Sequence, residues 1–132
     1  MIFVDSSFWI AQMVARDGRR DEALALQGVY DMGRLVTSSA VIAETWTFLR
    51  RRSGHRDAMV WLDRVLDASS LRRERVDEQL EADAWAWLRI HDERPYSFVD
   101  ATSFALMRRK RITDALAFDG DFAAAGFNEL RA

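Results

Sequence analysis

The sequence predicts an α/β domain, a three-layer α/β/α sandwich that is rich in helix and has a mainly parallel central sheet. Short apolar runs, such as residues 1–5, end in an acid and suit strands that are buried on both faces. Stretches with apolar residues three and four positions apart separate these runs and suit amphipathic helices. Because strands and helices alternate, we expect helices on both faces of the sheet.

The first half of the chain predicts two strands, each followed by helix. The expected elements are a strand at 1–5, a helix capped by Ser6 or Ser7, a helix over 19–32, a strand at 34–37, and a helix capped by Ser38 or Ser39. Serine hydroxyls favour helix N-termini because they accept hydrogen bonds from the first free backbone amides. Gly33 and Gly54 are placed to end two of these helices.

The second half repeats the alternation. The expected elements are helices over 56–67 and 77–91 with a strand at 70–76 between them, a helix from Ser97 to about Arg109, a strand at 115–118, a short helix, and a strand at 127–130. Ser97 and Asp100 have the spacing of a capping box, in which the acid three residues after the cap bonds back to it.

Composition limits the classes of protein that fit. The chain has 132 residues, 49% of them hydrophobic, and no linker, so we expect one domain over residues 1–132. No apolar run approaches the roughly 18 residues of a membrane helix, and the N-terminus is a poor signal peptide. We therefore expect a cytoplasmic protein without a membrane partner. The net charge of −2 does not by itself indicate a nucleic-acid binder.

The residue types exclude several kinds of site. There is no cysteine, which excludes disulfides, thiolate metal sites and a cysteine nucleophile. With two histidines in the chain, a histidine-rich metal site is excluded as well. Lys110 is the single lysine, and the other cations are arginines, which suit phosphate but also form ordinary salt bridges.

Five acids are expected to converge at one edge of the sheet. Asp5 and Asp119 each follow an apolar strand, and the carboxyl ends of parallel strands meet at the same edge. Asp121 follows two residues later, Asp100 lies in the first turn of a helix, and Glu44 lies within two turns of another helix start. Each acid alone has an ordinary structural explanation as a cap, a turn residue or a solvated side chain. Their joint arrangement predicts a site.

The chemistry of such a site follows from its charge. Carboxylates that share a cleft repel one another, so some take up protons or a cation neutralises them. Oxygen donors without histidine or cysteine suit a hard divalent ion, Mg²⁺ or Mn²⁺. Because paired ions of this kind activate water and stabilise the leaving oxygen of a phosphodiester, the acids predict metal-dependent phosphodiester hydrolysis.

Four segments in order resemble the PIN-domain ribonucleases, and most of all the small VapC-like toxins of type II toxin–antitoxin pairs. The segments are Phe3-Val4-Asp5-Ser6-Ser7, Ser39-Ala40-Val41-Ile42-Ala43-Glu44, Phe98-Val99-Asp100-Ala101-Thr102-Ser103, and Ala117-Phe118-Asp119-Gly120-Asp121-Phe122 with Gly126-Phe127 behind it. The resemblance implies a PIN-like fold and endonucleolytic cleavage of RNA, often structured RNA such as tRNA. It also implies a homodimer that a small antitoxin protein inhibits.

The resemblance also implies roles for individual residues. Asp5, Glu44, Asp100 and Asp119 match the acidic quartet that is catalytic and holds Mg²⁺ or Mn²⁺, and Asp121 matches a frequent fifth metal-binding acid. Ser7 matches a small hydroxyl residue that supports the site.

The chain departs from the pattern at Ala117, where the family often has threonine or serine, and residues 54–95 contain no family motif. Two alternatives therefore stay open. One is a PIN-like module that binds RNA or protein without cleaving. The other is a phosphoacceptor or phosphatase domain, although no lysine is placed to pair with a phosphoryl group.

Overall fold

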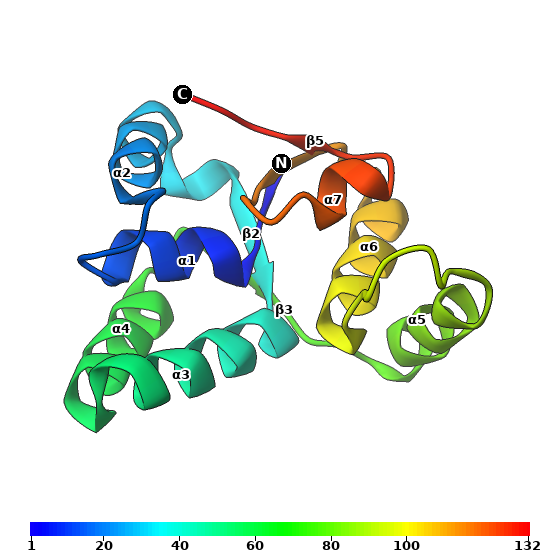
Figure 1. The fold of residues 1–132 in the computed structure, drawn as a ribbon, viewed down its shortest axis with the longest axis horizontal. Coiled ribbons are helices and arrows are strands. Elements are labelled where there is room, and N and C mark those ends of the chain that lie inside the picture. The colour runs from blue at the N-terminus through cyan, green and yellow to red at the C-terminus, as the bar shows by residue number, and fades with distance from the viewer.

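The computed structural model describes residues 1–132 as alternating strands and helices around one sheet (Figure 1). The elements are β1 (Ile2–Val4), α1 (Ser6–Met13), α2 (Arg20–Val29), the 3₁₀ helix η1 (Met32–Arg34), β2 (Leu35–Ser38), α3 (Ser39–Ser53), α4 (His55–Asp67), β3 (Arg72–Glu74), α5 (Glu78–Ile90), α6 (Phe98–Lys110), β4 (Asp114–Leu116), α7 (Asp121–Ala124) and β5 (Asn128–Glu129).

The five strands form a parallel sheet in the order β3-β2-β1-β4-β5. The central strand β1 pairs with β2 on one side and β4 on the other, with Phe3 opposite Val36 and Ala115. All three residues of β1 are buried, as expected for a strand covered on both faces. The carboxyl ends of β1, β2 and β4 therefore meet at one edge of the sheet.

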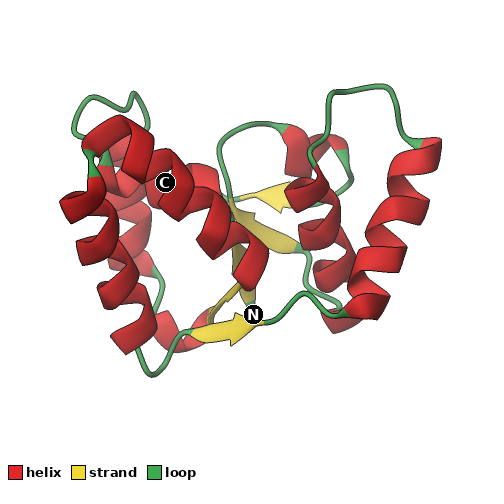
Figure 2. Ribbon diagram, turned by 90° about the horizontal axis from the view of Figure 1, so that it is seen from below, coloured by secondary structure: helices red, strands yellow, loops and turns green.

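Helices cover both faces of the sheet. α1 contacts α2 and α3, and α3 contacts α4, which forms one layer. α6 contacts α5 and α7, which forms the other layer (Figures 1 and 2). A single core of 27 buried apolar residues fills the space on both sides of the sheet, so the three-layer α/β architecture predicted from the sequence is confirmed.

The arginine-containing segment is a strand, but at the edge of the sheet. Arg72 and Arg73 lie in β3, which pairs with β2 alone. The guanidinium of Arg73 donates hydrogen bonds to the carbonyl oxygens of Val65 and Ala68, both at 3.1 Å. An edge position tolerates charged side chains because one side of the strand faces solvent.

Most element boundaries differ from the expectation by one or two residues, and two differences change how the chain is described. The helix predicted over 19–32 ends at Val29, where Tyr30 turns to extended backbone, and Gly33 lies inside η1 rather than ending α2. The chain must turn here so that Leu35 can pair with Ile2. The strand before Asp119 ends at Leu116, which leaves that acid in a loop. No helix of the structure is both long enough and apolar enough to cross a membrane.

Candidate functional site

Asp5 lies at the junction between β1 and α1 and is 1% exposed. Asp5, rather than Ser6 or Ser7 as expected, is the N-cap of α1, because its carboxylate reaches the free backbone amide. Its Oδ2 accepts hydrogen bonds from the backbone N–H of Ser7 at 3.2 Å and from the Ser7 hydroxyl at 2.7 Å. Its other oxygen, Oδ1, is buried without a hydrogen-bond partner. The side chain therefore caps a helix with one oxygen and leaves the second available.

Ser7 joins the ends of two neighbouring strands. Its hydroxyl oxygen donates to Asp5 and also accepts a hydrogen bond from the backbone N–H of Phe118 at 3.0 Å. Phe118 lies in the loop after β4, one residue before Asp119. The serine thus connects the loop that contains Asp119 to the N-terminus of α1, next to Asp5.

Asp100 belongs to the first turn of α6, and the predicted capping box is present. The Ser97 hydroxyl accepts from the backbone N–H of Asp100, and Oδ2 of Asp100 accepts from the backbone N–H of Ser97, both at 2.9 Å. This exchange orients the carboxylate at the helix N-terminus, where it is 7% exposed. A capping acid is usually at the surface, so its burial indicates a second role.

Asp119 and Asp121 lie on either side of Gly120, the N-cap of α7. Oδ1 of Asp119 accepts from the backbone N–H of Asp121 at 3.1 Å. Asp100, Asp119 and Asp121 each offer a carboxylate oxygen, and these oxygens all lie within 4.8 Å of one another. The structure therefore brings the acid of α6 together with the two acids after β4.

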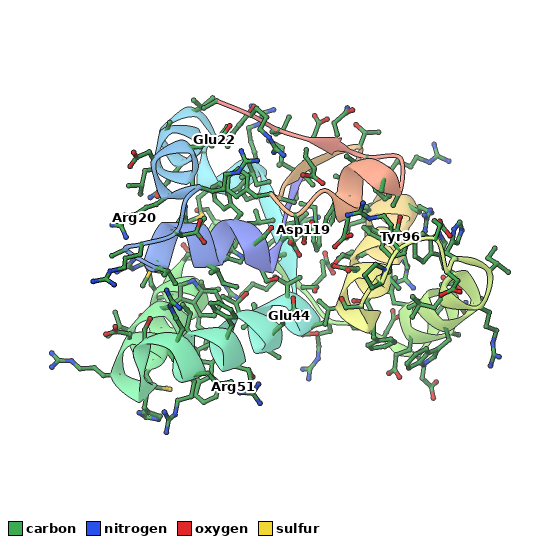
Figure 3. All side chains as sticks on the ribbon, in the orientation of Figure 1. Arg20, Glu22, Glu44, Arg51, Tyr96 and Asp119 are labelled. Atoms are coloured by element: carbon green, nitrogen blue, oxygen red, sulfur yellow. The ribbon has the colours of Figure 1, made fainter.

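Glu44 is not a member of that group of three. It lies on the second turn of α3, half-buried, and its Oε2 accepts a hydrogen bond from the Ser6 hydroxyl at 2.6 Å. Ser6 is the residue after Asp5, so this hydrogen bond connects Glu44 on α3 to the end of β1. Figure 3 shows Glu44 on the part of α3 nearest the sheet, and Asp119 beyond the end of β4. Of the five acids that were expected to converge, Asp100, Asp119 and Asp121 therefore form the closest group.

The electrostatics of the site indicate excess negative charge. Burial raises the pKa of Asp5 to about 8, and the nearby charge of Asp119 adds to the shift. Burial likewise raises the pKa of Asp100 to about 6, with a further contribution from the charge of Asp119. The pKa of Asp119 is also raised, because neighbouring protein atoms reduce its hydration and Asp121 is close. No cationic side chain forms an ion pair with Asp5, Asp100 or Asp119.

The five acids share a pattern that suits a cation. In each carboxylate one oxygen is engaged by a protein donor and the other accepts no hydrogen bond from the protein. The engaged oxygens are Oδ2 of Asp5, Oε2 of Glu44, Oδ2 of Asp100, Oδ1 of Asp119 and Oδ1 of Asp121. Hard divalent cations prefer such oxygen donors. The residues present therefore fit a hard divalent cation.

Two polar residues of the site were not predicted from the sequence. Ser6 is one, because its bond to Glu44 joins residues 38 positions apart. Arg94 is the other: it lies in the loop between α5 and α6, and its guanidinium bonds to Asp121. An arginine in a polar loop has no local sequence pattern that distinguishes it from a solvated one.

Known proteins resemble the chain over its full length. The model of the PIN domain family matches residues 2–128. The 23S rRNA-specific endonuclease VapC20 of Mycobacterium tuberculosis strain H37Rv is 53% identical over 131 residues, which cover 99% of this chain and 98% of that protein. The crystal structure of M. tuberculosis VapC20, described as a toxin that cleaves the sarcin–ricin loop, superposes with a TM-score of 0.95 at 51% identity, covering all of both chains.

A more distant structure shares the fold. The crystal structure of FitAcB from Neisseria gonorrhoeae superposes with a TM-score of 0.71 at 17% identity, covering 98% of this chain and 96% of that one. At this level of identity the likeness concerns the fold alone.

Proposed function

This chain belongs to the PIN domain family, and on that premise we propose that it is a metal-dependent endoribonuclease that hydrolyses RNA phosphodiester bonds. The observation that carries the proposal is the group formed by Asp100, Asp119 and Asp121, with Asp5 buried beside it. Identity of 53% to a 23S rRNA-specific endonuclease over nearly the whole chain supports the same reaction. The proposal treats residues 1–132 as a single PIN-like domain, in accord with the match over 2–128.

We assign the metal site to Asp5, Glu44, Asp100, Asp119 and Asp121, with Mg²⁺ or Mn²⁺ as the cation. Bound there, the cation supplies charge that activates a water and stabilises the negative charge that develops on the phosphate. The free oxygen in each carboxylate supports this assignment. The raised pKa of Asp5 and that of Asp100 support it as well, since a cation would favour the charged carboxylates that burial and neighbouring acids disfavour.

The protein's own groups orient the acids. Ser7 holds one oxygen of Asp5 and fixes the loop before Asp119. The capping box holds Asp100 on a regular helix, and Ser6 holds Glu44 from the end of β1. Acids fixed by helix caps and strand ends need little reorganisation when charge develops on the substrate, which is the general basis of electrostatic stabilisation in an active site.

For the substrate we propose the sarcin–ricin loop of 23S rRNA. The M. tuberculosis relative is a 23S rRNA-specific endonuclease, and its crystal structure is that of a toxin that cleaves the sarcin–ricin loop. It is a structured RNA, the class the sequence led us to expect, but ribosomal rather than transfer RNA. An rRNA target places the proposed activity in the cytoplasm.

The test is cleavage of a synthetic sarcin–ricin hairpin and of tRNA, each with Mg²⁺, Mn²⁺ or EDTA. The diagnostic variant is Asp100→Asn, because its amide oxygen can still accept the bond from the Ser97 N–H and keep the capping box. The matched control is Asp63→Asn, an exposed acid on α4. We expect discrete, metal-dependent fragments from the wild type and from the control, and none from Asp100→Asn.

The alternative is a PIN-like module that binds RNA or protein without cleaving. Tight RNA binding with no metal-dependent fragments from either RNA would favour it. Equal cleavage by the wild type and Asp100→Asn would instead show that the acids assigned here are not the active site.

We further propose that a small antitoxin protein binds this chain. A groove of about 870 Å³ between α1, α2 and α4, lined mainly by apolar side chains that include Trp9, Met13 and Tyr30, supports the proposal. Leu24 and Val29 on α2 line this groove and are 43% and 65% exposed. Contiguous exposed apolar surface of this kind marks interaction sites. A short neighbouring gene that encodes a DNA-binding fold with a helical tail would identify the partner. The groove is tested by co-purification: the partner should co-purify with the wild type but not with Leu24→Asp.

We also propose a homodimer. Phe48 on α3 and Trp85 on α5 are exposed aromatic side chains outside the groove. Phe48 lines a hollow together with Val99 at the start of α6, and Trp85 stacks on the adjacent Phe98, which supports an apolar surface at this end of α6. Sedimentation equilibrium of the wild type and Phe48→Glu tests it, with a monomeric wild type as the contrary result.

A further inference from the structure

Arg94 is the single cationic side chain that forms an ion pair with the group of Asp100, Asp119 and Asp121. Its Nε lies 3.0 Å and its Nη2 2.9 Å from Oδ1 of Asp121. Both contacts use the same oxygen, so Oδ2 of Asp121 accepts no hydrogen bond from the protein. Arg94 therefore lies beside the acids that we assign to the metal site and leaves Oδ2 of Asp121 free.

Most of the hydrogen-bonding capacity of Arg94 is unused. A guanidinium has five N–H donors in a rigid fork. Two of them point at Asp121, and the other three have no protein acceptor. The side chain is 40% exposed, so these donors face solvent at the edge of the site.

The segment that carries Arg94 is firmly attached. Pro95 restricts its own backbone and that of Arg94, the residue before it. The ring of Tyr96 packs between Trp87 at 4.8 Å and Phe104 at 5.8 Å, and Ser97 then begins the capping box of α6. An arginine held in this way loses little conformational freedom on binding, which favours recognition of an anion.

A cationic side chain at this place reduces the repulsion between the acids and an RNA phosphate. RNA brings a phosphate to a cleft that contains several carboxylates, and a bound metal ion offsets part of the repulsion. The guanidinium fork matches the planar pair of oxygens that a phosphate presents. Other arginines near the loop after β4 are engaged: Arg131 bonds to Glu129 and to the Ala117 carbonyl, and Arg19 bonds to Glu22.

We propose that Arg94 binds an RNA phosphate next to the one that is cleaved, using the donors that Asp121 leaves free, and so positions the RNA backbone over the acids. This inference rests on the proposed function and adds a substrate-binding residue to it. The competing explanation is that Arg94 only offsets the charge of Asp121 or fixes the loop.

The experiment measures binding of a labelled sarcin–ricin hairpin in EDTA, where cleavage is suppressed, over a series of salt concentrations. The variants are Arg94→Gln, Arg94→Lys and, as a charge-matched control, Arg56→Gln on α4 in the opposite helical layer, an exposed arginine without an ion pair. Circular dichroism confirms that each variant is folded.

If Arg94 contacts a phosphate, Arg94→Gln weakens RNA binding about tenfold, as for loss of a charged hydrogen bond. The slope of log K against log salt then falls by roughly 0.7–0.9, the value for one phosphate contact. Arg94→Lys keeps the slope but not the full affinity, because a point charge replaces the fork. With Mg²⁺ restored, Arg94→Gln raises KM and leaves kcat at saturating RNA close to that of the wild type.

Two results would overturn the inference. Unchanged or tighter RNA binding by Arg94→Gln would show that the arginine only offsets the acids. Weaker binding with an unchanged salt slope, reproduced by Asp121→Asn, would show that the ion pair acts through the loop structure. Failure of the proposed function is distinct from both, because the wild type would then give no metal-dependent fragments from the hairpin or from tRNA, whether or not it binds them.

Discussion

The hydroxyl of Ser7 lies between Asp5 Oδ2 at 2.7 Å and the backbone N–H of Phe118 at 3.0 Å, and it connects the ends of β1 and β4 through one atom. It donates to the carboxylate and accepts from the backbone, so both bonds form without competition. Because the two strands are neighbours in the sheet, this serine couples the position of Asp5 to the loop that carries Asp119.

Removing the hydroxyl tests this coupling. Ser7→Ala leaves the Phe118 N–H and the Asp5 carboxylate each short of a partner, and we expect a loss of about 1–3 kcal/mol in the free energy of unfolding. The bond to Ser7 lowers the pKa of Asp5, so that pKa should rise further in the variant. Urea unfolding measures the first effect. Ser7→Thr, which keeps the hydroxyl, should lose much less, and equal losses in both variants would contradict the explanation.

The stability of the metal-free protein should decrease as pH rises. The pKa of Asp5 is raised to about 8 and that of Asp100 to about 6, whereas both are close to 3.9 in an unfolded chain. The folded protein thus retains protons that the unfolded chain has released. The stabilisation is complete below about pH 4 and is lost as pH passes through about 6 and then about 8.

Urea unfolding in EDTA from about pH 5 to pH 8 measures this dependence. Asp5→Asn removes the group with the larger shift and should flatten the curve above about pH 6. A free energy of unfolding that increases over this range in the wild type would refute the assignment of raised pKa values.

A divalent cation should stabilise the folded protein. Binding to the folded state alone contributes about 2.7 kcal/mol when the free ion is at 100 times its Kd. We expect Mn²⁺ to raise the melting temperature of the wild type and of the control Asp63→Asn, and to have little effect on Asp119→Asn. Electron paramagnetic resonance of free Mn²⁺ gives the affinity for Mn²⁺ independently of activity. Equal affinity in all three proteins would show that Asp119 does not bind the ion.

Glu44 and Ser6 should affect the reaction to different degrees. Glu44→Gln removes a charge that we assign to the metal site, whereas Ser6→Ala leaves the charge and removes the 2.6 Å bond that orients it. We therefore expect cleavage to fall further in Glu44→Gln than in Ser6→Ala, each measured as kcat on the hairpin. Because Glu44 lies outside the closest group of acids, its loss should weaken Mn²⁺ binding less than Asp119→Asn does. The reverse order would make Glu44 the principal ligand.

Local patterns in the sequence determined the alternation of strands and helices, the serine caps of α3 and α6, and the chemistry of the donors. The capping box at Ser97 and Asp100 is an interaction between residues three apart, and the apolar run before Asp5 needs no distant partner to be recognised as a buried strand. Acids expected at one edge of the sheet, in a chain without cysteine, predict a hard cation rather than a soft one.

The tertiary structure alone decided which acids meet and what holds them. Ser6 and Glu44 are 38 residues apart, and Arg94 and Asp121 are 27 apart. Neither pair follows from helical or strand periodicity, since each depends on how separate elements pack on the sheet. The end of α2 at Val29 was likewise decided by the pairing of Leu35 with Ile2 rather than by helix propensity. Periodicity describes which face of an element is buried, whereas the contacts of a side chain depend on the neighbour that packing places beside it.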